Sequence, residues 1–202
     1  MDYLRGLTEK YPALRGAAGD IAEAFSVLKK TYADGGKLLV CGNGGSAADA
    51  EHIVGELMKG FYKQRPLPEA ERRGMEDLAP YLQGALPAIA LTGHPALATA
   101  FLNDVHPKMV FAQQVYGYGR PGDALLAIST SGNSENVLNA AKVAKARGLS
   151  VIGMTGRDGG ALRTLADVCI VVPGEATAEI QEYHLPVYHA LCAMLEEAFF
   201  KE

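Results

Sequence analysis

The chain has 202 residues, of which 49% are hydrophobic and 21% charged, and its formal net charge is −4. This length and composition are typical of one globular domain with a substantial core, and they exclude a disordered chain. The slightly acidic balance, without a long run of Lys or Arg, argues against a surface for nucleic acid or anionic membranes, and no apolar run approaches the roughly 20 residues of a membrane span.

The first segment, residues 1–34, is predicted to form a helical arm made of one or two amphipathic helices. Apolar side chains recur in it at helical spacing, at Ile21, Ala24, Phe25, Leu28 and Tyr32. An arm in this position usually packs on its own subunit or on a partner. The residues that begin the chain show no basic segment followed by an apolar run, so we expect no secretory signal and a cytoplasmic location.

Five short apolar runs, each followed by a polar loop or a helical pattern, are predicted to be strands. They are residues 37–41, 87–91, 124–128, 150–155 and 168–172, and helices are expected at 19–34, 46–60, 108–117, 134–147 and 178–200. The strands are apolar without alternation, which is typical of a parallel sheet covered on both faces. The predicted fold class is therefore α/β, a three-layer, doubly wound, five-stranded parallel sheet forming a single domain over residues 1–202.

Residues 63–86 are predicted to be a long surface insertion between a helix and a strand, with room for a short helix inside it. The segment contains Pro66, Pro68 and Pro80 together with many charged residues. Loops of this length are commonly functional lids or are poorly ordered.

Two loops that follow predicted strands are unusually polar. The first is residues 42–46, Gly-Asn-Gly-Gly-Ser, and the second is residues 129–134, Ser-Thr-Ser-Gly-Asn-Ser. Glycines let a backbone approach a ligand closely, and a helix N-terminus offers free N–H groups to an anion. The alternative is that these residues only cap helices and form turns. A cap would explain one Ser or Thr hydroxyl in residues 129–134, but it does not explain all four. Because no dinucleotide fingerprint or P-loop ending is present, a small sugar phosphate is the favoured ligand.

Two helical segments carry possible acid–base or metal-binding groups. His52 and Glu56 are four residues apart and share a helix face, and Gln181 and His189 lie eight apart on the last predicted helix. Together the four could form a mixed nitrogen and oxygen metal site or an acid–base pair. A surface hydrogen bond is the alternative for His52 and Glu56, and His184 is expected on the helix surface or at an interface.

Pro186 leaves the geometry of the last helix open. An interior proline removes one helical hydrogen bond and can kink the helix, whereas a proline in the first turn is tolerated. The sequence is compatible with either placement.

The assembled motifs resemble the sugar isomerase (SIS) domain, and most closely its phosphoheptose isomerases. The resemblance rests on CGNGGSAADAEH at 41–52, the Asn103-Asp104 pair, STSGNS at 129–134, TGRDGG at 155–160, and IQEYH at 180–184 followed by His189. These motifs occur in the expected order and cover nearly the whole chain. The family isomerises sedoheptulose 7-phosphate to D-glycero-D-manno-heptose 7-phosphate, usually as a homotetramer.

The resemblance also implies roles for individual residues. Substrate contacts fall on Asn43, Gly44, Gly45, Asn103, Asp104, Ser129, Thr130, Ser131, Ser134 and Gln181, and zinc ligands fall on His52, Glu56, Gln181 and His189. Glu56 would also be the catalytic base and His189 the acid. This chain departs from the family in the length of residues 63–86 and in Pro186, so the substrate mouth could differ.

The function expected is therefore an aldose–ketose isomerase acting on a phosphorylated sugar through an enediolate, with zinc, a small-molecule substrate, and neither nucleic acid nor membrane as partner. A non-catalytic SIS protein is the alternative, either a regulator associated with the replication initiator or a sugar-phosphate sensor. The presence of both Glu56 and His189 favours the enzyme, since the regulatory subgroup lacks counterparts of these two residues.

Overall fold

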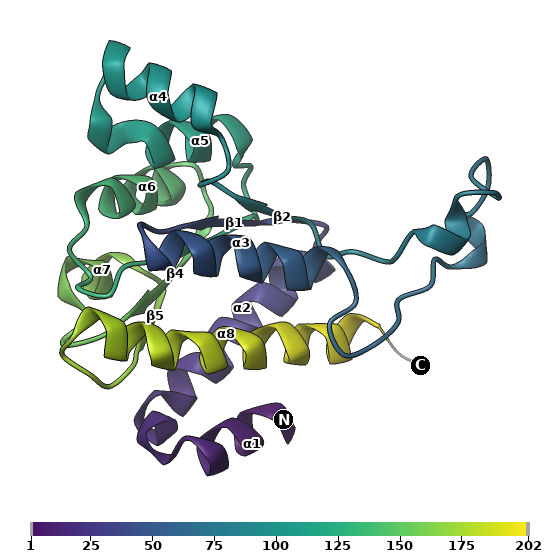
Figure 1. The fold of residues 1–202 in the computed structure, drawn as a ribbon, viewed down its shortest axis with the longest axis horizontal. Coiled ribbons are helices and arrows are strands. Elements are labelled where there is room, and N and C mark those ends of the chain that lie inside the picture. The colour runs from purple at the N-terminus through teal and green to yellow at the C-terminus, as the bar shows by residue number, and fades with distance from the viewer. Residues whose placement is uncertain (1, 201–202) are drawn as a thin grey trace.

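A computed structural model describes residues 2–200 and contains a five-stranded parallel sheet (Figure 1). The strands are β1 (Leu38–Cys41), β2 (Ala88–Ala90), β3 (Ala124–Ile128), β4 (Ser150–Thr155) and β5 (Val168–Val171), in the order β2-β1-β3-β4-β5. Every pairing is parallel. The predicted fold class is confirmed, and the winding reverses between β1 and β3, which is where ligands bind in open sheets of this kind.

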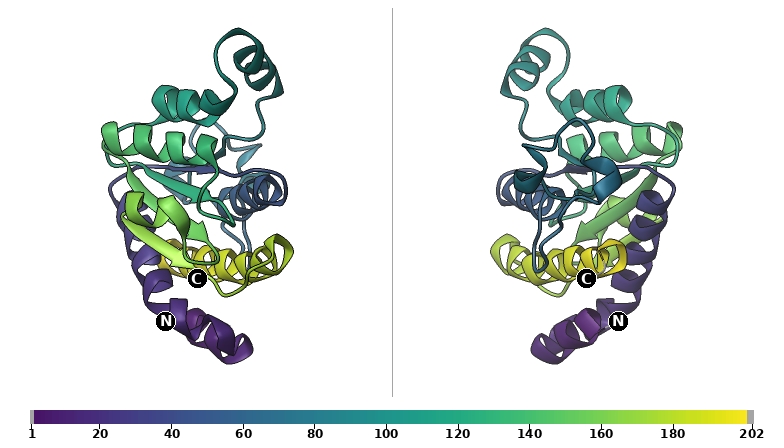
Figure 2. Two further views of the ribbon diagram at one scale, coloured as in Figure 1. Left: turned by 90° about the vertical axis from the view of Figure 1, so that its left-hand side faces the viewer. Right: turned by 90° about the vertical axis from the view of Figure 1, so that its right-hand side faces the viewer.

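Helices cover both faces of this sheet (Figures 1 and 2). They are α1 (Asp2–Lys10), α2 (Ala18–Ala33), α3 (Gly45–Met58), α4 (Pro95–Asp104), α5 (Val110–Tyr118), α6 (Glu135–Ala146), α7 (Gly160–Leu165) and α8 (Thr177–Phe199). The sequence did not indicate α4 or α7. Helix α4 carries apolar residues, among them Leu97, Phe101 and Leu102, but it buries none of its residues. With only six residues, α7 is too short for a periodic pattern.

The core consists of two apolar layers separated by the sheet. Val40 and Leu126 belong to the layer that contains residues of α2, α3 and α8. Leu39 and Leu125 point the other way, into the layer formed with α5, α6 and α7. Since successive strand residues alternate between faces and both faces are covered, the strands are apolar throughout.

The N-terminal arm is partly built into the body of the protein. It consists of α1, a 3₁₀ turn (Pro12–Ala17) and α2. Ile21, Ala24 and Leu28 are fully buried on α2, so this helix covers the sheet, whereas α1 packs on α8. Residue 1 lies outside the described residues.

Residues 63–86 form a surface excursion that extends away from the body (Figure 1). Two short 3₁₀ turns, Glu69–Glu71 and Ala79–Tyr81, stand where a short helix was expected. Its two ends are held together, because the amide of Gly84 donates to the carbonyl of Arg65 at 2.7 Å.

The last helix corrects the expectation for His184 and decides the placement of Pro186. His184 is fully buried, not on the surface, and burial lowers its pKa to about 4 against a smaller opposing effect of the Thr155 backbone. Near the end of this helix Leu195 is buried at 1% exposure, and Phe199 and the following Phe200 are half-buried. These three side chains face the core or the base of the 63–86 excursion, which the sequence pattern alone could not show. Pro186 lies in the helix interior.

Among residues 2–200, no helix combines the length and the apolar character that a membrane span requires.

Candidate functional site

The two polar loops lie side by side because they follow neighbouring strands, β1 and β3. Asn43 in the first loop and Asn136 at the start of α6 exchange two side-chain hydrogen bonds, of 2.8 and 3.0 Å. Asn136 was not among the predicted site residues, although it lies two positions after Ser134, where the polar run ends. The pair ties the two loops together at the point where the winding of the sheet reverses.

Hydroxyl groups line the second loop, residues 129–134. Ser129 Oγ donates to Ser134 Oγ at 3.0 Å, and Ser131 Oγ accepts the amide of Asn133 at 3.2 Å. Ser134 is the N-cap of α6 but makes no side-chain capping bond. Gly132 has a φ of +66°, and a Cβ there would meet the carbonyl oxygen of Gly159 at 1.9 Å. The backbone therefore requires glycine at this point of the loop.

The first loop is closed by Gln181 of α8. A Cβ on Gly45 would lie 2.5 Å from Gln181 Nε2, so a larger residue at the start of α3 would displace the Gln181 amide from this position. Gly44, the N-cap of α3, has a φ of +56°, which also favours glycine. The loop and Gln181 thus form one continuous surface.

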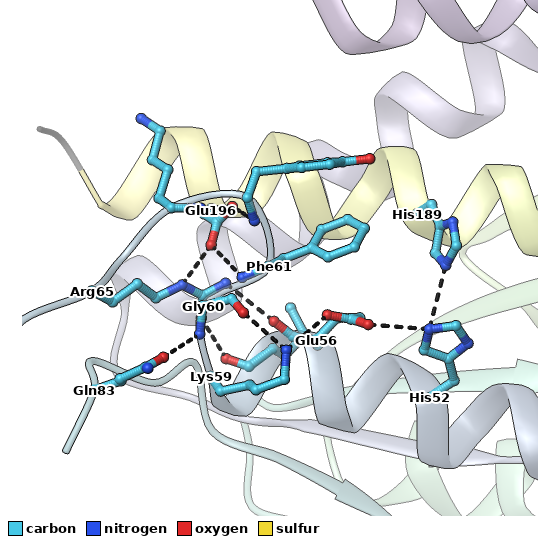
Figure 3. A network of polar contacts seen from close by, with 12 residues as sticks. His52, Glu56, Lys59, Gly60, Phe61, Arg65, Gln83, His189 and Glu196 are labelled. Carbon is cyan, nitrogen blue, oxygen red and sulfur yellow. Dashed lines mark hydrogen bonds and ion pairs between the residues drawn. The ribbon is translucent and has the colours of Figure 1, made fainter. Parts of the chain in front are cut away.

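His52, Glu56 and His189 converge between α3 and α8 (Figure 3). His52 Nε2 lies 3.1 Å from Glu56 Oε1 and 3.4 Å from His189 Nε2. Burial lowers the pKa of His189, as does His52, while the Glu56 carboxylate opposes the shift. Gln181, two turns earlier on α8, contacts the first loop, so the structure divides the predicted quartet into a cluster of three and a fourth residue at the loop.

Three further side chains adjoin this cluster and were not indicated by the sequence. The hydroxyl oxygen of Tyr188 lies 3.0 Å from His52 Nδ1, and the ring of Phe61 lies 5.4 Å from that of His189. Asp49 sits one turn before His52 on α3, beside Tyr188. The available signals were the three-residue spacing from Asp49 to His52 and the position of Tyr188 next to His189.

The chemistry of the predicted ligand set fits zinc. Two imidazoles and a carboxylate are common zinc ligands, and two nitrogens bound to one tetrahedral zinc at about 2.1 Å lie roughly 3.4 Å apart, which matches the separation of His52 and His189. Within residues 2–200, however, no three His, Cys, Asp or Glu side chains already form a metal-binding group. The donors suit zinc in type and in pairwise spacing, and zinc itself stays a prediction.

A buried ion pair holds the end of α3 beside this cluster (Figure 3). Arg65 donates to the carbonyls of Leu57 at 2.8 Å and Glu56 at 3.1 Å, and its Nε is bonded to Glu196. A cation at these carbonyls complements the negative end of the helix dipole. The backbone of Glu56 is therefore held by α8 through Arg65.

Asn103 and Asp104 lie apart from the cluster, at the exposed end of α4. Asn103 Nδ2 donates to Asp104 Oδ1 at 2.8 Å, and no contact joins either described side chain to His52, Glu56 or His189. Their helix nevertheless faces the first loop. A cavity of about 290 Å³ between the two is lined by Gly42, Asn43, Gly44, Ala47, Leu91, Thr92, Ala98, Leu102, Pro107, Val110, Phe111 and Asn136.

Known proteins resemble this chain in both sequence and fold. The model of the SIS domain matches residues 2–78 and 72–156. The phosphoheptose isomerase of Rhodospirillum rubrum is 44% identical over 185 residues, covering 92% of this chain and 89% of that protein. The phosphoheptose isomerase of Akkermansia muciniphila is 37% identical and covers 98% of both chains.

Solved structures agree with the sequence comparison. A phosphoheptose isomerase from Francisella tularensis superimposes with a TM-score of 0.79 at 35% identity, covering 97% of this chain and 95% of that one. The phosphoheptose isomerase from Neisseria gonorrhoeae superimposes with a TM-score of 0.76 at 36% identity, covering 96% of each.

Proposed function

We propose a specific reaction for this chain, which belongs to the SIS domain family of phosphoheptose isomerases and is a phosphosugar isomerase. The reaction is the interconversion of sedoheptulose 7-phosphate and D-glycero-D-manno-heptose 7-phosphate. The observation that carries the proposal is the convergence of an acid–base cluster, His52, Glu56 and His189, in a chain so similar to these isomerases.

The phosphate would lie on the loop of residues 129–134. Its hydroxyls, together with amides at the start of α6, offer several donors to phosphate oxygens. Asn43, Gly44 and Gly45 of the adjoining loop would contact the sugar, with Gln181 beside them. Asn103 and Asp104 would reach the sugar from the end of α4, the helix that contributes Ala98 and Leu102 to the cavity next to this loop.

Glu56 is the proposed base. Its carboxylate would remove the proton from the carbon beside the carbonyl, and the electron pair of that C–H bond would form the carbon–carbon double bond of an enediolate. His189 would move a proton between the two oxygens, and return of the proton from Glu56 to the neighbouring carbon completes the isomerisation. Positioned acid–base groups contribute about 10²–10⁴-fold each. Glu56 is 14% exposed, so it is sheltered from water yet accessible.

We further propose that His52, Glu56, Gln181 and His189 hold one zinc ion per subunit. Bound there, zinc would polarise the carbonyl of the substrate. Metal analysis of tag-free protein tests this, and the His52→Ala protein should hold much less zinc than the parent. Equal zinc content in the two proteins would refute the ligand assignment.

A homotetramer in the cytoplasm is the proposed state of the protein. The support from the structure is α4, which buries none of its residues and leaves Leu97 and Leu102 exposed, together with Val105 directly after it. Exposed apolar groups of this density commonly lie at an interface.

The test of the reaction is a turnover screen of four- to seven-carbon sugar phosphates with identification of each product. We expect the highest kcat/KM with sedoheptulose 7-phosphate. Preference for a shorter sugar would replace the proposed substrate, and tight binding of every sugar phosphate without turnover would instead support the sensor alternative.

A further inference from the structure

Glu196 of α8 binds the segment that follows α3, residues 60–65, through both of its carboxylate oxygens. Its Oε1 accepts the amide of Phe61 and the Nε–H of Arg65, each at 2.8 Å. Its Oε2 accepts the amides of Tyr62 and Lys63, at 2.8 and 3.2 Å. A carboxylate has about four acceptor positions, and in Glu196, which is only 1% exposed, donors from this one segment occupy them. The 60–65 segment is therefore fixed relative to α8.

Phe61 is the residue of this segment that reaches the proposed active site. Its ring centroid lies 5.4 Å from that of His189, with the two planes tilted by 50° (Figure 3). His189 and Glu196 are about two helical turns apart, so they lie on one face of α8. The carboxylate that binds the amide of Phe61 and the imidazole that its ring contacts thus belong to the same helix.

Other contacts support Phe61 around this position. Its ring is half-buried and packs against the apolar layer that contains residues of α2, α3 and α8. The Tyr62 ring lies 4.2 Å from it and is itself stacked on Tyr3 of α1, with centroids 6.0 Å apart. Directly before it, the amide of Gly60 donates to Gln83 Oε1 at 2.7 Å, at the returning end of the excursion. Both the backbone and the ring of Phe61 are therefore held.

We propose that Phe61 is a positioning residue, whose ring fixes the orientation of the His189 imidazole and which Glu196 holds in place through the backbone of the 60–65 segment. The torsion that rotates an imidazole about its Cβ–Cγ bond is broad, so a half-buried histidine takes its orientation from its neighbours. For His189 these are His52, with the two Nε2 atoms 3.4 Å apart, and the ring of Phe61.

The orientation of His189 matters because the proposed function, on which this inference rests, gives it the transfer of a proton between substrate oxygens. A rotated imidazole would carry its Nε2 away from the place where it faces His52. Displacement of a reacting group by about 1 Å can lower a rate by about 10²-fold. The expected effect is therefore on kcat, since the proposed phosphate donors lie elsewhere, in the loop of residues 129–134.

Phe61→Leu tests the ring, because it keeps an apolar side chain and leaves the backbone amide on Glu196. We expect kcat with the best sugar phosphate to fall about 10–100-fold, with KM little changed. Phe61→Tyr keeps the planar ring and should restore most of kcat. A parental kcat in Phe61→Leu, or an equal loss of kcat in both variants, would overturn the proposal.

The matched control is Phe25→Leu, since Phe25 is also half-buried and packs against the same apolar layer, but from α2. Both substitutions to Leu should lower the urea midpoint by similar amounts, and Phe25→Leu should keep the parental kcat. A fall of kcat in Phe25→Leu as large as that in Phe61→Leu would assign the effect to packing alone and overturn the proposal.

NMR contacts between aromatic rings give a readout that needs no turnover, and the chain has only six Phe and five His to assign. The parent should show a nuclear Overhauser contact between ring protons of Phe61 and His189. Glu196→Asp, whose carboxylate is one methylene shorter, should weaken this contact and lower kcat together. Absence of the contact in the parent, or its survival at full strength in Glu196→Asp, would overturn the proposal.

The two Phe61 variants keep the Glu196 carboxylate, so they decide the role of the ring if Glu196→Asp does not fold. An assay in which the parent turns over no sugar phosphate would refute the proposed function. The NMR contact would then still show whether the 60–65 segment positions His189, so the two failures are distinguishable.

Discussion

Arg65 and Glu196 form a fully buried ion pair, with Arg65 Nε 2.8 Å from Glu196 Oε1, although 131 positions separate them in the chain. The amides of Phe61 and Tyr62 also donate to the Glu196 carboxylate, each at 2.8 Å. Burial raises the pKa of Glu196, but these amides and Arg65 outweigh it, so the net shift is downward. The pair joins α8 to the end of α3 that carries Glu56.

Glu196→Ala should lower the free energy of unfolding by about 3–5 kcal/mol, because it leaves the Arg65 charge buried and unpaired. Urea unfolding measures this change. Glu197→Ala is the control, since its carboxylate pairs with Lys63 from an exposed position and should cost less than about 1 kcal/mol. Similar losses in the two variants would show that burial of the pair is unimportant to stability.

His184 should make the protein sensitive to acid. The pKa of His184 is about 4 in the folded protein and 6.5 in the unfolded chain. Between these two pH values the unfolded chain therefore binds more protons than the folded protein. Stability is therefore full above about pH 6.5 and decreases as the pH falls, by roughly 2 kcal/mol at about pH 5. In His184→Leu this part of the decrease should disappear, as measured by denaturant unfolding at both pH values.

The control for His184 is His106→Gln, because His106 is exposed. It should retain the acid sensitivity of the parent. A parental pH dependence in His184→Leu would mean that other groups cause the loss of stability.

Glu56→Gln should reduce isomerisation by about 10²–10⁴-fold while sugar-phosphate binding stays close to the parental value. The amide keeps the size of the side chain but cannot accept the substrate proton at neutral pH. Calorimetry measures the affinity, and exchange of the substrate's α-hydrogen with solvent deuterium measures proton removal. Zinc must be determined on the same preparation, since loss of the metal would also slow exchange.

Exchange at the parental rate in Glu56→Gln would show that Glu56 is not the base. Asp104 would then be the next residue to test, although in the structure its carboxylate accepts from Asn103, away from His52.

Ser131→Ala should raise KM about fivefold and change kcat little, because it removes one phosphate donor of several, worth about 1 kcal/mol. The serine accepts the Asn133 amide at 3.2 Å, so its hydroxyl proton is free for an external partner. Steady-state kinetics separate the two constants. A fall in kcat at unchanged KM would assign Ser131 to the chemical step.

Light scattering after gel filtration should find a tetramer, and Leu102→Arg on α4 should shift it toward smaller species. The Leu102 side chain is 49% exposed in the single chain. A charge there should therefore have little effect on folding, and it should weaken assembly only if a partner subunit covers this position. A monomeric parent at micromolar concentration would contradict the proposed assembly.

The sequence alone was sufficient for the sheet and for the two loops. Buried parallel strands are continuous apolar runs, so β3 and β4 were located to the residue, and the polar residues after β1 and β3 stood out against them. Helix α3 also lies close to its predicted range, 46–60, because its sequence has a strong local pattern. Helix α4 was missed although its sequence is apolar, and the structure leaves all of its residues unburied.

Only the tertiary structure decided which residues meet. The burial of His184, the Arg65–Glu196 pair and the contact of Tyr188 with His52 all join segments far apart in the chain, or depend on how α8 is rotated against the sheet. Periodicity shows which residues share a face of a helix, but not which segment packs against that face. The chemical groups of the site can thus be read from the sequence, whereas their partners, their burial and the direction of their hydrogen bonds follow from packing.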